Sequence, residues 1–154
     1  MYSSSLFILG LSALSSALPA LAPRDKCEAP VSFTISGFTT FTPAEGNPKP
    51  AAVFFSIGND GDSSSITRCS RTGNINAAEP AACTNTNTIF RFKNGTLTVG
   101  DHYVSCSGTQ SQAFGDVGIA TYCYPSQPPM PNGFGTQCQT PTGQLSGTFT
   151  RDTL

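Results

Sequence analysis

The side chains best suited to chemistry in this sequence lie around its single histidine. His102 follows Asp101, and Ser105 lies three positions further along the chain. An aspartate, a histidine and a serine can form a hydrolytic triad, but a triad is defined by its geometry in space and this spacing is not typical of one. If residues 102–107 form a strand, His102 and Ser105 point to opposite faces. We therefore expect no catalytic residue here and keep a small hydrolase as the second alternative.

The acidic residues form no recognisable pair or metal site. Glycoside hydrolysis needs two carboxyl groups across a cleft, and Glu28, Glu45 and Glu79 each stand beside a loop or a proline. Asp60 and Asp62 lie in a stretch rich in Gly, Asn and Asp, but the glycine and distal glutamate of a calcium-binding loop do not follow in register. This composition is typical of a tight turn. We expect no metal and no cofactor.

The cysteines indicate disulfides in place of a metal site. The chain has six of them, at positions 27, 69, 83, 106, 123 and 138, without the close pairs that zinc sites require. Six cysteines allow many pairings, and sequence alone does not decide between them. Two pairs, Cys69–Cys83 and Cys123–Cys138, close irregular loops. The pairing we favour therefore leaves Cys27–Cys106 as the third bridge.

The N-terminus has the pattern of a secretory signal peptide. Leu6–Leu14 is an apolar segment too short to span a bilayer, and small residues follow it. Cleavage is predicted after residue 17, or as late as 22, which leaves 18–26 as a short disordered lead and 27–154 as a single β domain. No later stretch approaches the roughly 18 apolar residues of a membrane span. We expect the protein to be secreted.

The elements that position these residues are predicted to be short strands. Only 11% of the residues are charged and the formal net charge is −1, so there is no basic excess for nucleic acid. Residues 31–36 alternate apolar and polar side chains up to Gly37, and further strands are predicted over 51–57, 66–69 and 113–124. The fold class is all-β: a disulfide-stapled sandwich or flattened barrel of about eight short antiparallel strands.

The clearest local signal is a hairpin within Ile89–Cys106. Asn94-Gly95 is a typical two-residue hairpin turn, and the apolar residues around it recur at every second position, so we expect them on one buried face: Phe90, Phe92, Leu97 and Val99. A third strand, 102–107, is predicted to follow and to contain Cys106. Asn94 also begins the sequon Asn-Gly-Thr and is a candidate N-glycosylation site.

Aromatic residues beside a proline-rich loop are a candidate binding surface for sugars. Tyr122 and Tyr124 precede a proline-rich loop, 126–132, and Phe134 follows it. Tyrosine rings can stack on sugars, although the chain has no tryptophan. These residues are the basis of a carbohydrate-binding alternative.

The order of cysteines and strands resembles a known family. Cys27 precedes an F-x-I-x-x-F strand from Phe33 to Phe38, and an apolar AVFFSI strand, an N-D-G turn, F-R-F, L-T-V, Y-V-S-C and two late cysteines follow. This order resembles small cysteine-rich secreted proteins of filamentous fungi, in particular the Alternaria major-allergen-like family. The resemblance implies a β-sandwich or β-barrel without established catalytic residues. It also implies a role as an allergen, an elicitor or an effector that meets plant defence proteins.

The sequence thus predicts a secreted, non-enzymatic fungal protein, effector-, elicitor- or allergen-like, that binds a host or environmental partner through its surface. The alternative is a cell-wall or carbohydrate-binding module that uses Tyr122 and Tyr124. A secreted hydrolase that uses Asp101, His102 and Ser105 is the second alternative. The partner is expected to be a protein or a cell-wall glycan, and its identity and the oligomeric state are left open.

Overall fold

The structure is a computed structural model, and it describes residues 27–59, 66–128 and 130–153. The predicted signal peptide, the lead over 18–26 and the turn with Asp60 and Asp62 lie outside the described residues. Within the described part of the chain no helix is long and apolar enough to cross a membrane.

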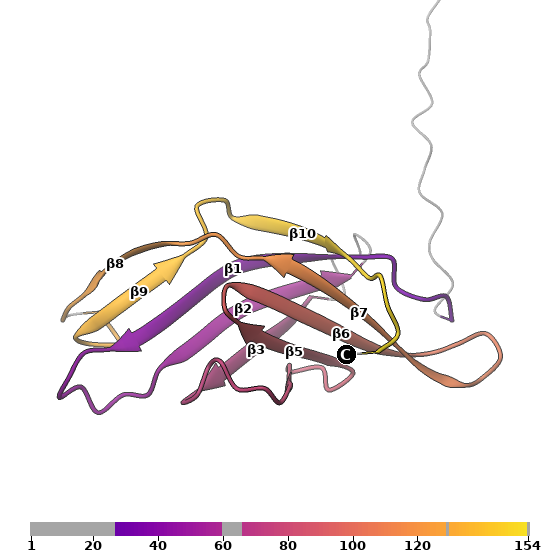
Figure 1. Cartoon of the computed structure of the whole chain (residues 1–154), viewed down its shortest axis with the longest axis horizontal. Coiled ribbons are helices and arrows are strands. Elements are labelled where there is room, and N and C mark those ends of the chain that lie inside the picture. Colours follow the sequence, from indigo (N-terminus) through magenta and orange to yellow (C-terminus); the bar gives the residue numbers. More distant parts are fainter. Residues whose placement is uncertain (1–26, 60–65, 129, 154) are drawn as a thin grey trace, which may run out of the picture.

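The described residues form ten strands in two antiparallel sheets, which confirms the all-β class (Figure 1). The larger sheet has the order β3-β2-β1-β9-β8, with β10 also paired to β1, and the smaller has the order β4-β5-β6-β7. In chain order the strands are β1 Ser32–Pro43, β2 Ala52–Asn59, β3 Thr67–Thr72, β4 Ala81–Ala82, β5 Thr88–Lys93, β6 Thr96–Val104, β7 Gln110–Gly118, β8 Tyr122–Ser126, β9 Gly135–Gln139 and β10 Gln144–Thr148.

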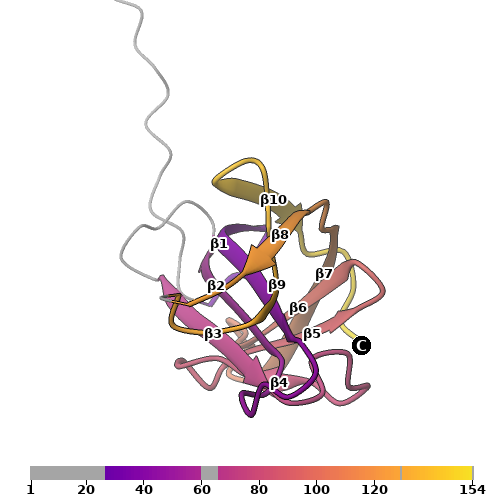
Figure 2. The ribbon, with the colours of Figure 1, turned by 90° about the vertical axis from the view of Figure 1, so that its left-hand side faces the viewer.

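The core lies between the two sheets and is rich in phenylalanine. Phe55 of the larger sheet meets Phe90 of the smaller one edge-on, with ring centroids 4.9 Å apart, and Phe38 meets Phe92 at 5.2 Å. Aliphatic side chains of both sheets fill the space around these rings, among them Ile35, Val53, Ile57, Leu97 and Val99. The arrangement is a flattened sandwich with β8 and β9 at one end (Figures 1 and 2).

The predicted hairpin is confirmed as β5 and β6. Asn94 has φ 50° and Gly95 has φ 77°, the positive pair that a type I′ turn requires. Phe90 pairs with Val99 and Phe92 with Leu97. Directly opposed residues share a face of a sheet, so all four point into the core as the alternation predicts.

The separate third strand over 102–107 is a wrong prediction. β6 continues without a break to Val104, and Cys106 lies in the following turn. Gly100 lies within this strand at a tightly packed position, where a Cβ would come within 2.4 Å of the Phe114 ring and 2.8 Å of Ile89. Gly100 thus leaves room for neighbouring side chains and does not end the strand.

The alternation pattern predicted that the first strand ends at Gly37, and this prediction is also wrong. β1 runs through it to Pro43, and its register with β2 shifts between Ser36 and Thr39. Gly37 has φ 63°, so the irregularity is a β-bulge at a residue that adopts this backbone conformation easily. Beyond the bulge the alternation changes phase: Phe38 enters the core, while Thr39 and Phe41 turn to the outer face.

The predicted strand over 113–124 is two strands in different sheets. β7 ends at Gly118, and the backbone N–H of Ile119 then donates to the carbonyl of Gly95 at 2.7 Å. The chain thus crosses at the tip of the hairpin and enters the larger sheet as β8. Strand propensity could not reveal this crossing because it depends on a contact between distant segments.

All six cysteines are bonded in the structure, in the three pairs favoured above. Cys69–Cys83 joins β3 to the segment after β4, and Cys27–Cys106 ties the start of the described chain to the turn after β6. Cys123 and Cys138 are direct partners on β8 and β9, with Cα atoms 4.0 Å apart. The last bridge fixes the register of these two strands.

Candidate functional site

The three residues of the hydrolase alternative lie in different surroundings. Asp101 accepts hydrogen bonds from Asn59 Nδ2 at 2.9 Å and from Thr88 Oγ1 at 3.3 Å. His102 is its neighbour on β6 and points to the opposite face. Ser105 lies beyond the strand, where its Oγ is engaged within the 105–109 turn. No triad arrangement is formed by these side chains.

His102 borders an open depression of about 240 Å³. The other lining residues are mainly polar and belong to the turn before β5, the end of β6 and the start of β7: Thr86, Asn87, Tyr103, Val104 and Gln110. None of these residues is a carboxylate or a cysteine. Across the described residues there is no group of three or more His, Cys, Asp or Glu side chains that could hold a metal ion.

A hydrogen-bonded polar surface is formed by β8 and β9 at the end of the larger sheet. Tyr122 is paired with Gln139 and Tyr124 with Gln137, and these four residues flank the Cys123–Cys138 bridge. Since side chains alternate along a strand, all four project to the same face and the disulfide to the other. We call these four residues the tyrosine–glutamine ladder.

A chain of hydrogen bonds connects the ladder in one direction. Gln137 Nε2 donates to the Tyr124 hydroxyl at 2.8 Å, and that hydroxyl donates to Gln139 Oε1 at 3.3 Å. Gln139 Nε2 in turn donates to the hydroxyl of Tyr122. Successive hydrogen bonds of this kind polarise and restrain one another. The two rings are therefore held in place before any partner arrives.

The ladder remains open to solvent although it is ordered. Tyr122 is 47% exposed, and the two tyrosine rings lie 6.1 Å apart at an interplanar angle of 33°. An aromatic pair held in this way, with Tyr122 exposed, Tyr124 partly buried and amides adjacent, can stack on an apolar surface and exchange hydrogen bonds with polar groups. Such a surface suits binding.

Sequence reasoning found the tyrosines of the ladder and missed the glutamines. A signal was present: the chain contains Tyr-Cys-Tyr at 122–124 and Gln-Cys-Gln at 137–139. A cross-strand bridge between the two central cysteines places the flanking residues opposite one another. The favoured Cys123–Cys138 pairing therefore already implied the ladder.

Asn94 lies at the exposed tip of the central hairpin. Its position in a type I′ turn gives the side chain a direction away from the sheet. A glycan attached to Asn94 would extend into solvent. Asn94 lies in a hairpin of the smaller sheet, whereas the tyrosine–glutamine ladder belongs to the larger one. Modification there would leave the ladder uncovered.

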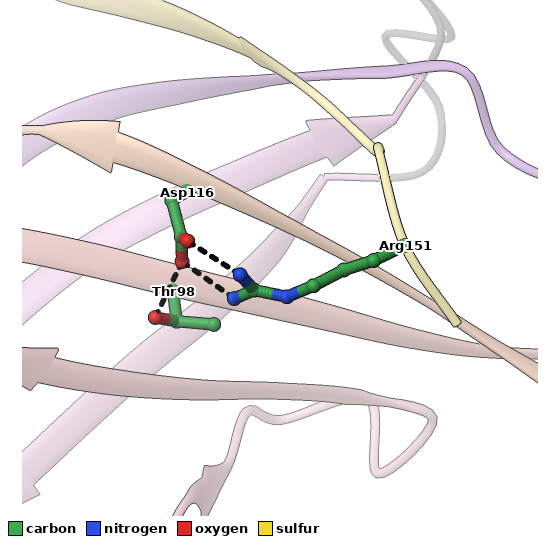
Figure 3. A network of polar contacts seen from close by, with 3 residues as sticks. All are labelled: Thr98, Asp116 and Arg151. Carbon is green, nitrogen blue, oxygen red and sulfur yellow. Dashed lines mark hydrogen bonds and ion pairs between the residues drawn. The ribbon is translucent and has the colours of Figure 1, made fainter. Parts of the chain in front are cut away.

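A second polar network holds the C-terminal segment against the smaller sheet (Figure 3). Arg151 contacts Asp116 through both guanidinium nitrogens, at 2.9 Å and 2.8 Å, and Thr98 Oγ1 donates to the same carboxylate at 2.6 Å. Burial raises the pKa of Asp116, but the hydrogen bonds of Thr98 and Arg151 and the charges of Arg151 and Arg91 outweigh it, so the pKa lies below its ordinary value. The network attaches the C-terminal segment to β6 and β7 of the smaller sheet.

Comparisons with known proteins show a shared fold. No family model matches the sequence, and no curated protein matches it in sequence. The chain is similar to a crystal structure of the Alternaria alternata major allergen Alt a 1, with a TM-score of 0.56 and 17% identity over 77% of this chain and 92% of that chain. A second crystal structure of the Alt a 1 allergen gives a TM-score of 0.58 and 18% identity, over 85% of this chain and 95% of that one. The resemblance predicted from the sequence is confirmed for the fold.

Proposed function

We propose that this protein is secreted and acts outside the cell by binding a partner through its surface, without catalysing a reaction. In this proposal it is an effector-, elicitor- or allergen-like protein of a fungus, and its partner belongs to a host or to the surroundings. The observation that supports the proposal is the tyrosine–glutamine ladder, an exposed and hydrogen-bonded surface on a disulfide-locked hairpin.

Two further observations agree with this proposal. Three disulfides are typical of proteins that work in an oxidising, extracellular setting. The fold is that of the Alt a 1 structures, which are described as allergens. The side chains Asp101, His102 and Ser105 form no common site, so the hydrolase alternative has no geometric support.

The test is delivery of the purified protein to plant leaf tissue, with the ladder variant Tyr122→Ala as comparison. We expect cell death or a defence marker, or a bound host component, with a weaker response to the variant. Assays on glycan and peptide substrates should show no turnover. A protein without any response or partner, or one with turnover above a heat-treated control, would contradict the proposal.

The second candidate function is binding to a cell-wall carbohydrate, and the held pair Tyr122 and Tyr124 is the observation that favours it. Aromatic rings of this kind can receive the apolar faces of sugars. Sedimentation with insoluble chitin and β-glucan tests this candidate. Retention that is lost in Tyr122→Ala and in Tyr124→Ala would support it over a protein partner.

A further inference from the structure

The tyrosine–glutamine ladder continues across the larger sheet in two rows of outward side chains. The strand pairings place Tyr122, Gln139, Thr39 and Phe54 next to one another on β8, β9, β1 and β2. The row beside it consists of Tyr124, Gln137, Phe41 and Ala52 in the same order of strands. Phe41 and Ala52 are buried, so the first row is the one that is accessible from end to end. Figure 1 shows these four strands side by side. We call this surface the outer-face rows.

The bulge at Gly37 brings β1 into the outer-face rows. Without the shift of register, Thr39 and Phe41 would keep the phase of Phe33 and Ile35 and would point into the core. With it, Phe41 lies on the outer face, where its ring covers Gly135: a Cβ on Gly135 would come within 2.6 Å of the ring. The rows are thus continuous because of a specific irregularity in the strand.

The aromatic groups lie at both ends of the first row. Tyr122 is 47% exposed and Phe54 is 42% exposed, and they are three strand spacings apart, or about 14 Å. Between them lie the Gln139 amide and the Thr39 hydroxyl. A ligand that covers both aromatic ends must therefore be elongated, and it must offer hydrogen-bonding groups along its middle.

The outer-face rows also have no charge. Neither row contains an acidic or basic side chain among the described residues, and Arg68 on β3 begins only the next row. A charged ligand would find no counter-ion here, whereas a neutral ligand does not need one.

The Tyr122 hydroxyl also has an unused donor. It accepts a hydrogen bond from Gln139, and within the described part of the chain its own hydrogen has no protein acceptor.

We propose that the outer-face rows bind a neutral, unbranched polysaccharide, laid across β8, β9, β1 and β2 from Tyr122 to Phe54. This inference rests on the proposed binding function and names the class of partner. Sugar rings present apolar C–H faces to aromatic residues and hydroxyl groups to amides, and the first row offers aromatic rings at its two ends with an amide and a hydroxyl group between them. Because the tyrosines are already held by the glutamines, little side-chain freedom is lost on binding.

A protein partner is less favoured by the same residues. Protein–protein interfaces rely on aromatic, methionine and arginine side chains that fill pockets in the partner. The first row instead places the amide of Gln139 and the hydroxyl of Thr39 between two separate aromatic ends. The Gln139 amide and the Thr39 hydroxyl, side by side across the strands, match a ligand that repeats its own hydroxyl groups.

The experiment is a titration of the full mature protein with soluble neutral β-glucan and chitin oligosaccharides of increasing length, followed by calorimetry. Affinity should rise with length until the chain spans both aromatic ends and then level off. Tyr122→Ala and Phe54→Ala should each weaken the longest ligand about tenfold. Tyr122→Phe should keep most of the affinity, and the control Val104→Ala, an exposed apolar residue on the smaller sheet, should keep all of it.

The alternative outcomes separate the two proposals. Equal binding by wild type and both aromatic variants would overturn the assignment of the outer-face rows. Tighter binding of an anionic polysaccharide such as polygalacturonate would overturn the argument from charge. If no glycan binds but a purified host protein does, and the Tyr122→Ala variant weakens that complex, the polysaccharide inference fails while the binding function stands. Thermal unfolding of each variant establishes that it is folded.

Discussion

Replacement of Asp116 should weaken the attachment of the C-terminal segment to the smaller sheet by a measurable amount. The carboxylate is half-exposed: in its ion pair with Arg151, the side chain of Arg151 is 39% exposed and that of Asp116 is 40% exposed. Exposed pairs usually contribute up to about 1 kcal/mol, and the two-contact geometry places this one at the upper end. We therefore expect Asp116→Asn to lower the free energy of unfolding by about 1 kcal/mol at pH 7. Asp116→Ala should cost roughly 1–2 kcal/mol more, because it also leaves the buried Thr98 hydroxyl without its acceptor.

The same carboxylate predicts how this stabilisation changes with pH. The pKa of Asp116 is lower in the folded protein than its ordinary value. Stability from such a group is fully present above the ordinary carboxyl pKa, about 4, and is lost as the pH falls through the lower folded value. The difference between wild type and Asp116→Asn should therefore be constant at neutral pH and shrink in acid.

Urea unfolding with the disulfides intact is the assay. A loss of about 1 kcal/mol corresponds to a midpoint shift of roughly 0.5 M urea. Asp152→Asn, an exposed acid in the same segment, is the matched control and should change stability by less than about 0.5 kcal/mol. A double-mutant cycle with Arg151→Met isolates the pair. Variants that match the control at pH 7, or a difference that persists unchanged well below pH 3, would refute the reasoning.

Three other predictions concern the smaller sheet. Gly100→Ala should destabilise the protein by about 1–3 kcal/mol in the same assay, because the added Cβ meets the Phe114 ring. Gly118→Ala, where nothing lies within 4 Å, should be nearly neutral, and equal effects of the two would contradict the packing argument. Gly95→Ala should cost roughly 1–2 kcal/mol, since residue 95 has φ 77°; an unchanged urea midpoint would argue against the type I′ turn. Protein secreted from a fungal host should carry an N-glycan at Asn94, seen as a mass difference that Asn94→Gln abolishes, and an unmodified wild-type mass would count against the site.

Features set by neighbouring residues were predictable from the sequence. The hairpin turn follows from Asn94-Gly95, because positive φ at two successive positions limits the residues that fit there. The core face of β5 and β6 follows from alternation around that turn. Tyr122 and Tyr124 stood out as candidate binding residues because they are aromatic residues beside a proline-rich loop.

Features that depend on distant contacts were not predictable. In the sequence Gly37 resembles the end of a strand, because only the pairing of β1 with β2 and β9 shows that the strand continues beyond the bulge. Gly100 likewise resembles a strand breaker until the ring of Phe114 is seen above it. The Arg151–Asp116 pair spans 35 residues of sequence, and neither residue has a local pattern that identifies the other.

The ladder lies between these two cases. Its tyrosines were identified from composition, and its glutamines follow from the disulfide once the Cys123–Cys138 pairing is assumed. What the sequence could not supply is the hydrogen-bond chain that orients the rings. It also could not supply the extension to Thr39 and Phe54, which requires the register of β1 on both sides.

The central claim is that this protein acts by binding through the tyrosine–glutamine ladder, and backbone NMR tests it most directly. The labelled mature protein would be titrated with a soluble neutral β-glucan oligosaccharide long enough to span the outer-face rows. We predict saturable shifts of the amides of 122–126 and 135–139, extending to 39–41 and 52–54, with the depression beside His102 unaffected. Shifts centred on that depression, or none on β8 and β9 at saturating ligand, would contradict the claim.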